Sequence, residues 1–186
     1  MVDKIGNILA KDYGLDRPVE QKSFYVKGAE HCDWGMKDRL ARIFDPKSGR
    51  TVMLAFDHGY IMGPTAGLER LDLAIPPLAP YADVLMATRG AIKTCVPPTF
   101  NKAIALRSTT DVLHEDLSYG HVGVDVEDAI RLNASCIVVQ TFVGSKNEVG
   151  SFKNLSDMIN AGNRYGIPVM GVTAVGKEME RTKRYF

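Results

Sequence analysis

The stretch Thr51-Val52-Met53-Leu54-Ala55-Phe56-Asp57-His58-Gly59-Tyr60 decides the fold. An apolar run of this length, bounded by turn residues, is typical of a strand buried on both faces, and such strands occur mainly in parallel sheets covered by helices. In barrels built from such sheets, the chemistry lies where the strands end. Asp57 and His58 stand at that point, and a carboxylate beside an imidazole is suited to proton transfer. The alternative is that Asp57 caps a turn and His58 is structural.

The composition indicates one soluble globular domain that carries no framework of disulfides or metals. The chain has 186 residues, of which 45% are hydrophobic and 24% charged, and its net charge is +1. No basic stripe indicates a nucleic-acid partner, and no apolar stretch of about 18 residues indicates a membrane span. Cys32, Cys95 and Cys136 are widely spaced and odd in number, so we expect a reducing, cytoplasmic location and no metal site.

Residues 1–50 are interpreted as an N-terminal extension with a covering helix. Ser23–Val26 is a candidate short strand, and Asp33 is expected to cap a helix over Trp34–Phe44, whose apolar residues recur at helical spacing. Asp45–Gly49 has the composition of a turn. We expect the helix to cover the bottom of a barrel or an oligomer interface.

Five strand-like runs alternate with helical stretches in the rest of the chain. One helix is expected to begin near Leu68–Leu73, a second after Asp125 with Asp128 at the capping-box position, and a third over Ser151–Tyr165. This alternation predicts a parallel sheet with right-handed crossovers. The strands are expected to be neighbours in chain order: Val52–Phe56, Val84–Met86, Ala103–Leu106, Cys136–Phe142 and Pro168–Val172.

The pattern suits either a TIM (β/α)₈ barrel or a doubly wound sheet. A doubly wound nucleotide fold requires a glycine-rich loop after its first strand, whereas Gly59, Gly63 and Gly67 recur at intervals of four and form no G-x-G-x-x-G. The barrel is therefore favoured. A complete barrel needs about 250 residues, so residues 51–186 are interpreted as the first five β/α units of a truncated α/β barrel.

Several short blocks in the chain together carry a family resemblance. From about Phe24 to Phe186 the sequence resembles the class I aldolase family of DhnA/DeoC type, most closely the autoinducer-2 thiolases within it. Asp-His-Gly alone is weak, because related sugar-phosphate aldolases carry it too, whereas the combination is specific. The matching blocks are Asp33-Trp34-Gly35-Met36, Arg42-Ile43-Phe44, Val52 to Tyr60, Gly67-Leu68-Glu69-Arg70, Ala82-Asp83-Val84-Leu85-Met86 with Thr88-Arg89-Gly90, Val96-Pro97-Pro98, and Ala174-Val175-Gly176-Lys177.

The resemblance implies a TIM barrel that assembles into a homo-oligomer, typically a decamer. It implies transfer of an acetyl group from a phosphorylated five-carbon dione to coenzyme A, which is a cosubstrate, with no bound cofactor. It also implies a Schiff-base lysine on the sixth strand, beyond Phe186, so this chain alone is expected to be inactive and to associate. The alternatives are a class I aldolase acting on another sugar phosphate, such as fructose bisphosphate, and a noncatalytic fragment or assembly partner.

The resemblance also implies roles for particular residues. Asp57 matches the family aspartate that lies near the Schiff-base lysine, and His58 either binds a substrate oxygen or fixes its loop. Phe142 stands where more distant aldolases have a proton-transferring tyrosine, which weakens a fructose-bisphosphate aldolase interpretation. Lys177 follows the fifth strand and is expected to be a loop residue rather than the nucleophile.

Other candidate substrate-binding residues are named for their positions at strand ends. Arg107 ends the third strand, Thr88 and Arg89 follow the second, and Ser145 follows the fourth. An arginine at this edge suits a phosphate or a carboxylate, and the alternative for both arginines is an ion pair that braces neighbouring loops. We expect Asp57, Thr88, Arg107 and Phe142 to point toward one cavity.

Overall fold

A five-stranded parallel sheet, curved into a half-barrel, forms the body of the protein. The computed structural model describes residues 4–6, 16, 24–110 and 117–182. In this part of the chain the sheet order is β1-β2-β3-β6-β7, with every neighbouring pair parallel. The predicted order and direction are therefore confirmed. The strands are β1 Met53–Ala55, β2 Val84–Ala87, β3 Ala103–Arg107, β6 Cys136–Val143 and β7 Val169–Val175.

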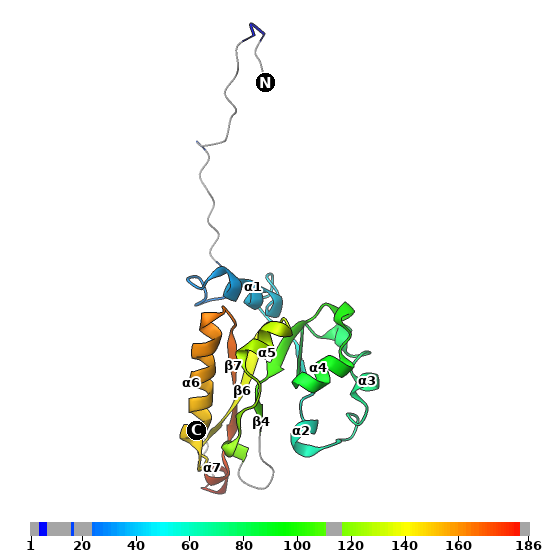
Figure 1. Ribbon diagram of the computed structural model, residues 1–186, viewed down its shortest axis with the longest axis vertical. Helices are drawn as coiled ribbons and strands as arrows, with labels where there is room; N and C mark the ends of the chain where they lie inside the picture. Colours follow the sequence, from blue (N-terminus) through cyan, green and yellow to red (C-terminus); the bar gives the residue numbers. More distant parts are fainter. Residues whose placement is uncertain (1–3, 7–15, 17–23, 111–116, 183–186) are drawn as a thin grey trace.

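Helices lie along one side of the sheet and cross its amino-terminal end (Figure 1). Short turns of helix occupy the loop after β1, and the longest helix, α6, runs between β6 and β7. No helix in the described ranges is long and apolar enough to cross a lipid bilayer. The helices are α1 Trp34–Ile43, α2 Gly59–Met62, α3 Leu71–Ala74, α4 Arg89–Cys95, α5 Val126–Arg131, α6 Glu148–Arg164 and α7 Lys177–Thr182, with 3₁₀ turns η1 Ala79–Tyr81, η2 Pro98–Phe100 and η3 Leu117–Tyr119.

Two apolar clusters cover the two faces of the sheet, which is why the strands read as continuous apolar runs. Leu85, Leu106 and Ile137 belong to the cluster on the helix side, which includes Met158 of α6. Alternate residues of the same strands form the second cluster, on the inner face: Val84, Met86, Ala103, Ala105, Cys136 and Val138, with Met53, Met170 and Val172 packed against them. The two-residue alternation fixes which side chains face the inside of the half-barrel.

The helix α1 closes the amino-terminal end of the sheet, as the sequence predicts (Figure 1). Its cap is confirmed, because the Asp33 carboxylate accepts a hydrogen bond from the Met36 amide at 2.8 Å. Arg39 Nη1 donates to the Gly166 carbonyl at 3.1 Å, just before β7, and Ile43 packs into the inner cluster. The alternative role at an oligomer interface stays a prediction.

Several boundaries differ from the sequence prediction. Phe24–Val26 forms no strand, so that prediction is wrong there, and Ser23 lies outside the described residues. The helix α6 begins at Glu148, three residues before Ser151. The Glu148 carboxylate lies in its first turn and accepts a hydrogen bond from the Gly144 amide at 2.8 Å. Two further strands, β4 Thr109–Thr110 and β5 His121–Val122, form an antiparallel pair that was not predicted.

The predicted cap of α5 is confirmed in one half only. The Asp125 carboxylate accepts from the Asp128 amide at 2.9 Å. The side chain of Asp128 does not complete a capping box, because it binds the guanidinium groups of Arg89 and Arg131. The charged guanidinium groups of Arg89 and Arg131 bind the Asp128 carboxylate more strongly than a neutral backbone amide would.

Candidate functional site

The carboxyl ends of β1, β3 and β6 bring polar side chains together on the inner face of the sheet. Asp57 follows β1 by two residues, Arg107 ends β3, and Gln140 lies four residues after the first residue of β6. The alternation that places Met53, Ala105 and Val138 in the inner cluster also turns Asp57, Arg107 and Gln140 to that side. These residues therefore meet at the edge where barrel enzymes carry out their chemistry.

Arg107 is the centre of this group. Its guanidinium donates from Nη1 to Asp57 Oδ2 at 3.2 Å and from Nη2 to Tyr60 Oη and Gln140 Oε1, both at 2.5 Å. Its Nε donates to the Thr109 carbonyl at 3.1 Å. The side chains of Arg107 and Asp57 are only 4% and 8% exposed, so the ion pair is removed from water.

The geometry favours the bracing alternative for Arg107 over direct binding of a phosphate. A buried ion pair must compensate for the water that both ions lose, and the further hydrogen bonds to Tyr60 and Gln140 serve that purpose. A guanidinium with its donors directed at four protein groups holds the carboxylate of Asp57 in place. The predicted contact between Arg107 and substrate stays a prediction.

A hollow of about 250 Å³ opens beside Arg107 at the mouth of the half-barrel. It brings together Thr88 and Arg107, two of the predicted site residues. The Thr88 hydroxyl accepts from the Ala91 amide at 3.3 Å as the N-cap of α4, which fixes its side chain at the rim. The other lining residues are Tyr60, Arg89, Gly90, Thr109, Thr110, Gly123 and Val124.

Arg89 lies at this rim but is held from outside by an ion pair. Its guanidinium binds the carboxylate of Asp128, which also binds Arg131. The hydrogen bond from Arg131, followed by that from Arg89, lowers the pKa of the Asp128 carboxyl below its ordinary value. Arg89 thus joins the start of α4 to α5, as the bracing alternative anticipates.

The remaining predicted site residues lie at the same end but do not line the hollow. His58 is exposed and precedes α2 without a side-chain capping bond. Phe142 is buried at 5% exposure, and its amide donates to Ser151 Oγ at 3.1 Å. Ser145 Oγ donates to the Phe142 carbonyl at 3.1 Å. The hollow is therefore lined by Thr88 and Arg107, with Asp57 bonded to Arg107, and the expectation that Phe142 points toward it stays a prediction.

The loop after β6 approaches the end of β7 too closely for side chains. A Cβ on Gly176 would lie 2.4 Å from the Ser145 amide nitrogen, and Gly144 has a φ of +71°. Lys177 follows directly as the exposed first residue of α7. Its position in a loop-to-helix turn agrees with the predicted loop role and places it outside the inner face.

Sequence reasoning did not single out Tyr60 or Gln140. Gln140 left a signal, because it is a polar residue at an inward position of a largely apolar strand. Tyr60 follows Asp57 by three residues, and the short helix α2 turns it back over Arg107, whose Cζ lies 5.2 Å from the Tyr60 ring centroid. No apolar periodicity in the sequence predicts such a turn.

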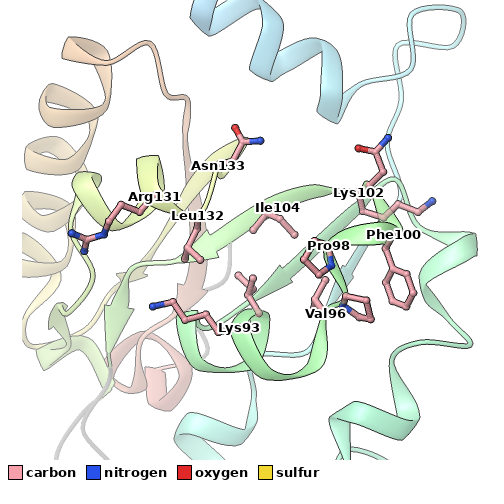
Figure 2. A pocket seen from close by; sticks show the side chains of 12 residues that line it. Lys93, Val96, Pro98, Phe100, Lys102, Ile104, Arg131, Leu132 and Asn133 are labelled. Atoms are coloured by element: carbon pink, nitrogen blue, oxygen red, sulfur yellow. The ribbon is translucent and has the colours of Figure 1, made fainter.

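A second hollow, of about 460 Å³, lies away from this site between α4 and α5 (Figure 2). Figure 2 shows Ile104 and Leu132 beside it, with Lys93 and Val96 on the α4 side. It contains none of the predicted site residues. Within the described ranges no cluster of three histidine, cysteine or acidic residues has the geometry of a metal site. The sequence also places His114, Glu115 and Asp116 in one polar segment without the spacing of metal ligands, and these three residues lie outside the described ranges.

Comparison with known proteins reveals close relatives of this chain. It is 53% identical over 177 residues to an uncharacterized aldolase of Pasteurella multocida, covering 95% of this chain. It is 51% identical over 177 residues to the 3-hydroxy-5-phosphonooxypentane-2,4-dione thiolase of Yersinia pseudotuberculosis and 52% identical over 178 residues to that of Klebsiella pneumoniae, again covering 95% of this chain. The chain spans 61% of the length of the first two relatives and 60% of the third. No family model matches.

Solved structures of aldolases share the fold. An archaeal fructose-1,6-bisphosphate aldolase, whose catalytic lysine is bound to a carbinolamine intermediate, superimposes with a TM-score of 0.63 at 22% identity. The match covers 76% of this chain and 59% of that one. A fructose-bisphosphate aldolase of Slackia heliotrinireducens gives a TM-score of 0.62 at 13% identity, covering 89% and 57%. The half-barrel is thus the aldolase type of TIM barrel in part, which confirms the predicted fold class.

Proposed function

We propose that this chain, a homologue of the 3-hydroxy-5-phosphonooxypentane-2,4-dione thiolases, forms part of an enzyme with their acyl-transfer reaction. In this reaction the acetyl group of the phosphorylated dione passes to coenzyme A, and acetyl-CoA and dihydroxyacetone phosphate are released. The observation that carries the proposal is about 50% identity to these thiolases over 95% of the chain. The buried pair of Asp57 and Arg107 at the mouth supports it.

Asp57 is the group assigned to the reacting centre. Its carboxylate lies on the inner face at the carboxyl end of β1, where it can stabilise a cationic iminium or relay a proton. Arg107 fixes its position and balances its charge in the absence of substrate. His58 and Thr88 supply hydrogen-bonding groups from the loops on either side, and Ser145 and Phe142 border the site at the end of β6.

The proposed nucleophile is a Schiff-base lysine that lies outside this chain. None of the five strands of the sheet contains a lysine. Lys177 stands at the start of α7, exposed to solvent and outside the inner face of the sheet where a Schiff-base lysine would lie. The phosphate handle, the contact with coenzyme A and assembly into a homo-oligomer, by family a decamer, are likewise assigned to the whole protein.

A class I aldolase that cleaves another sugar phosphate is the second candidate. It is favoured by the structural likeness to fructose-bisphosphate aldolases, a likeness that at 22% identity concerns the fold. The two reactions differ in the acceptor of the cleaved fragment, since only the thiolase requires coenzyme A. Phe142 carries no exchangeable proton at its strand end, which weakens the aldolase candidate.

The test is an assay of the natural full-length protein with the phosphorylated dione, with and without coenzyme A. The proposal expects acetyl-CoA only when both are present, and a lysine that borohydride links to the substrate. Asp57→Asn should lower kcat by about 10²–10⁴-fold, whereas Asp72→Asn, in an exposed ion pair with Arg70, should not. Cleavage of fructose bisphosphate without coenzyme A would favour the second candidate. No turnover of either substrate would point to a noncatalytic assembly partner.

A further inference from the structure

We infer that Tyr60 is the residue that delivers a proton to the substrate at this mouth, with Arg107 as the positioning residue that activates it. This inference rests on the proposed function. Tyr60 matched one of the family blocks only as the last residue of a longer stretch, and no role was assigned to it from the sequence. Its contacts in the structure give it one.

The phenol of Tyr60 is placed between the buried ion pair and the open hollow. Its Oη accepts from Arg107 Nη2 at 2.5 Å, and the guanidinium lies 5.2 Å from its ring centroid. The residue is half-buried and lines the hollow beside Thr88. A phenol that accepts from a guanidinium still carries its own proton, and the cation stabilises the phenolate that is left when this proton departs.

The charged groups of the described residues around the phenol favour its ionisation on balance. Arg107 of β3 is in contact, and Arg89 of α4 lines the same hollow. Asp57 opposes them, but its carboxylate is bonded to Nη1 of Arg107, which neutralises much of its charge. Arg89 is itself partly neutralised by Asp128, and the side chain of His58 is exposed in the preceding turn. The neutral side-chain amide of Gln140 accepts a hydrogen bond from the same Nη2 atom of Arg107 as the phenol does.

The proposed reaction needs a proton at one defined step. The thiolate of coenzyme A forms a bond to the acetyl carbonyl carbon, and the carbon–carbon bond to the phosphorylated fragment breaks. The electron pair of that bond passes into the iminium formed between the fragment's ketone and the proposed lysine, and the resulting enamine must gain a proton at carbon before water hydrolyses the imine and releases the fragment. Tyr60 gives this proton, and its phenolate later recovers one from solvent, which balances the proton that coenzyme A lost when its thiol became a thiolate.

The first test measures the ionisation of Tyr60 directly and requires no turnover. The full-length protein is labelled with tyrosine carrying ¹³C at Cζ, and Tyr60→Phe identifies the signal. We expect Tyr60 to ionise at lower pH than free tyrosine, and Arg107→Gln to remove this shift. Should that variant fail to fold, Asp57→Asn decides, because it frees the charge of Arg107 and should lower the ionisation pH further. Ionisation like that of free tyrosine in both the wild type and Asp57→Asn would overturn the inference.

The second test separates proton delivery from a structural role. In Tyr60→Phe, the first turnover should yield one equivalent of acetyl-CoA at a near-normal rate, while steady-state kcat falls by about 10²–10⁴-fold with little change in KM. Tyr81→Phe removes an exposed phenol that does not line the hollow and is the matched control. Equal slowing of the first and later turnovers would contradict proton delivery. If the wild-type protein makes no acetyl-CoA, the proposed function fails and proton delivery in that reaction fails with it, whereas the ionisation measurement still shows separately whether Arg107 activates the phenol of Tyr60.

Discussion

Replacement of Arg107 by methionine should destabilise the fold more than any surface substitution, because it leaves the buried carboxylate of Asp57 without its counter-ion. The two side chains are 4% and 8% exposed and are joined at 3.2 Å. Removal of one partner of a buried ion pair typically costs about 3–5 kcal/mol. Gln140 and the Thr109 carbonyl also lose a charged donor, so a value toward the upper end of that range is expected.

The assay is urea unfolding followed by circular dichroism on wild type, Arg107→Met, Asp57→Asn and the double variant. The double variant should recover at least about 1 kcal/mol relative to the sum of the two single losses, since the neutral amide introduced at position 57 needs no counter-ion. Arg70→Met is the matched control. It also breaks an arginine–aspartate pair, but that pair is exposed to water, so stability should change little.

Two results would refute this reasoning. The first is a loss below about 1 kcal/mol for Arg107→Met, which would mean that water reaches Asp57 easily. The second is strict additivity of the two substitutions, which would mean that the ion pair does not couple them.

Three further predictions concern other parts of the fold. The hydrogen bonds from Arg131 and Arg89 lower the pKa of the Asp128 carboxyl, so this group stabilises the fold above about pH 4. The difference in free energy of unfolding between wild type and Asp128→Asn should therefore shrink as the pH falls through the lowered pKa. A constant difference from about pH 7 to 3 would disprove this prediction. Burial raises the pKa of the Cys136 thiol to about 12, so iodoacetamide at about pH 8 should label the other two cysteines of the native protein and spare this one, as mass spectrometry will show. Gly176→Ala places a Cβ 2.4 Å from a backbone nitrogen of the loop after β6, so it should lower the midpoint of thermal unfolding, and an unchanged midpoint would show that this loop yields freely.

The helices of the chain show how local signals succeed and where they stop. Asp33 and Asp125 were identified as caps because a short acceptor before an apolar periodic run satisfies free amides, and both bind the third amide after them. Asp128 left the same kind of signal, yet its carboxylate binds two arginines instead. One of these, Arg89, lies 39 residues away in the chain, and local pattern carries no information on such a partner.

The site shows the same limit. Asp57, Thr88 and Arg107 were found because each stands at or just after the end of an apolar strand, and parallel strands bring such ends to one edge; β1 itself is only half-buried, not buried on both faces as its sequence predicts. Tyr60 and Gln140 were missed because their importance comes from Arg107, to which both bind. For Phe142 the structure shows a buried side chain that is not among the residues lining the hollow, and its expected contact with the site stays a prediction.

The sequence by itself determined the parallel order of the strands and the relationship to aldolases and thiolases. These features depend on apolar periodicity and short motifs, both of which involve residues close together in the chain. Only the tertiary structure decided that Arg107 gives its hydrogen bonds to Asp57, Tyr60, Gln140 and Thr109 rather than pointing free into the mouth. The physical reason is that a buried guanidinium must satisfy its donors, and the curvature of the sheet and the turn of α2 bring Asp57, Tyr60 and Gln140 within its reach from 33 to 50 residues away in the chain.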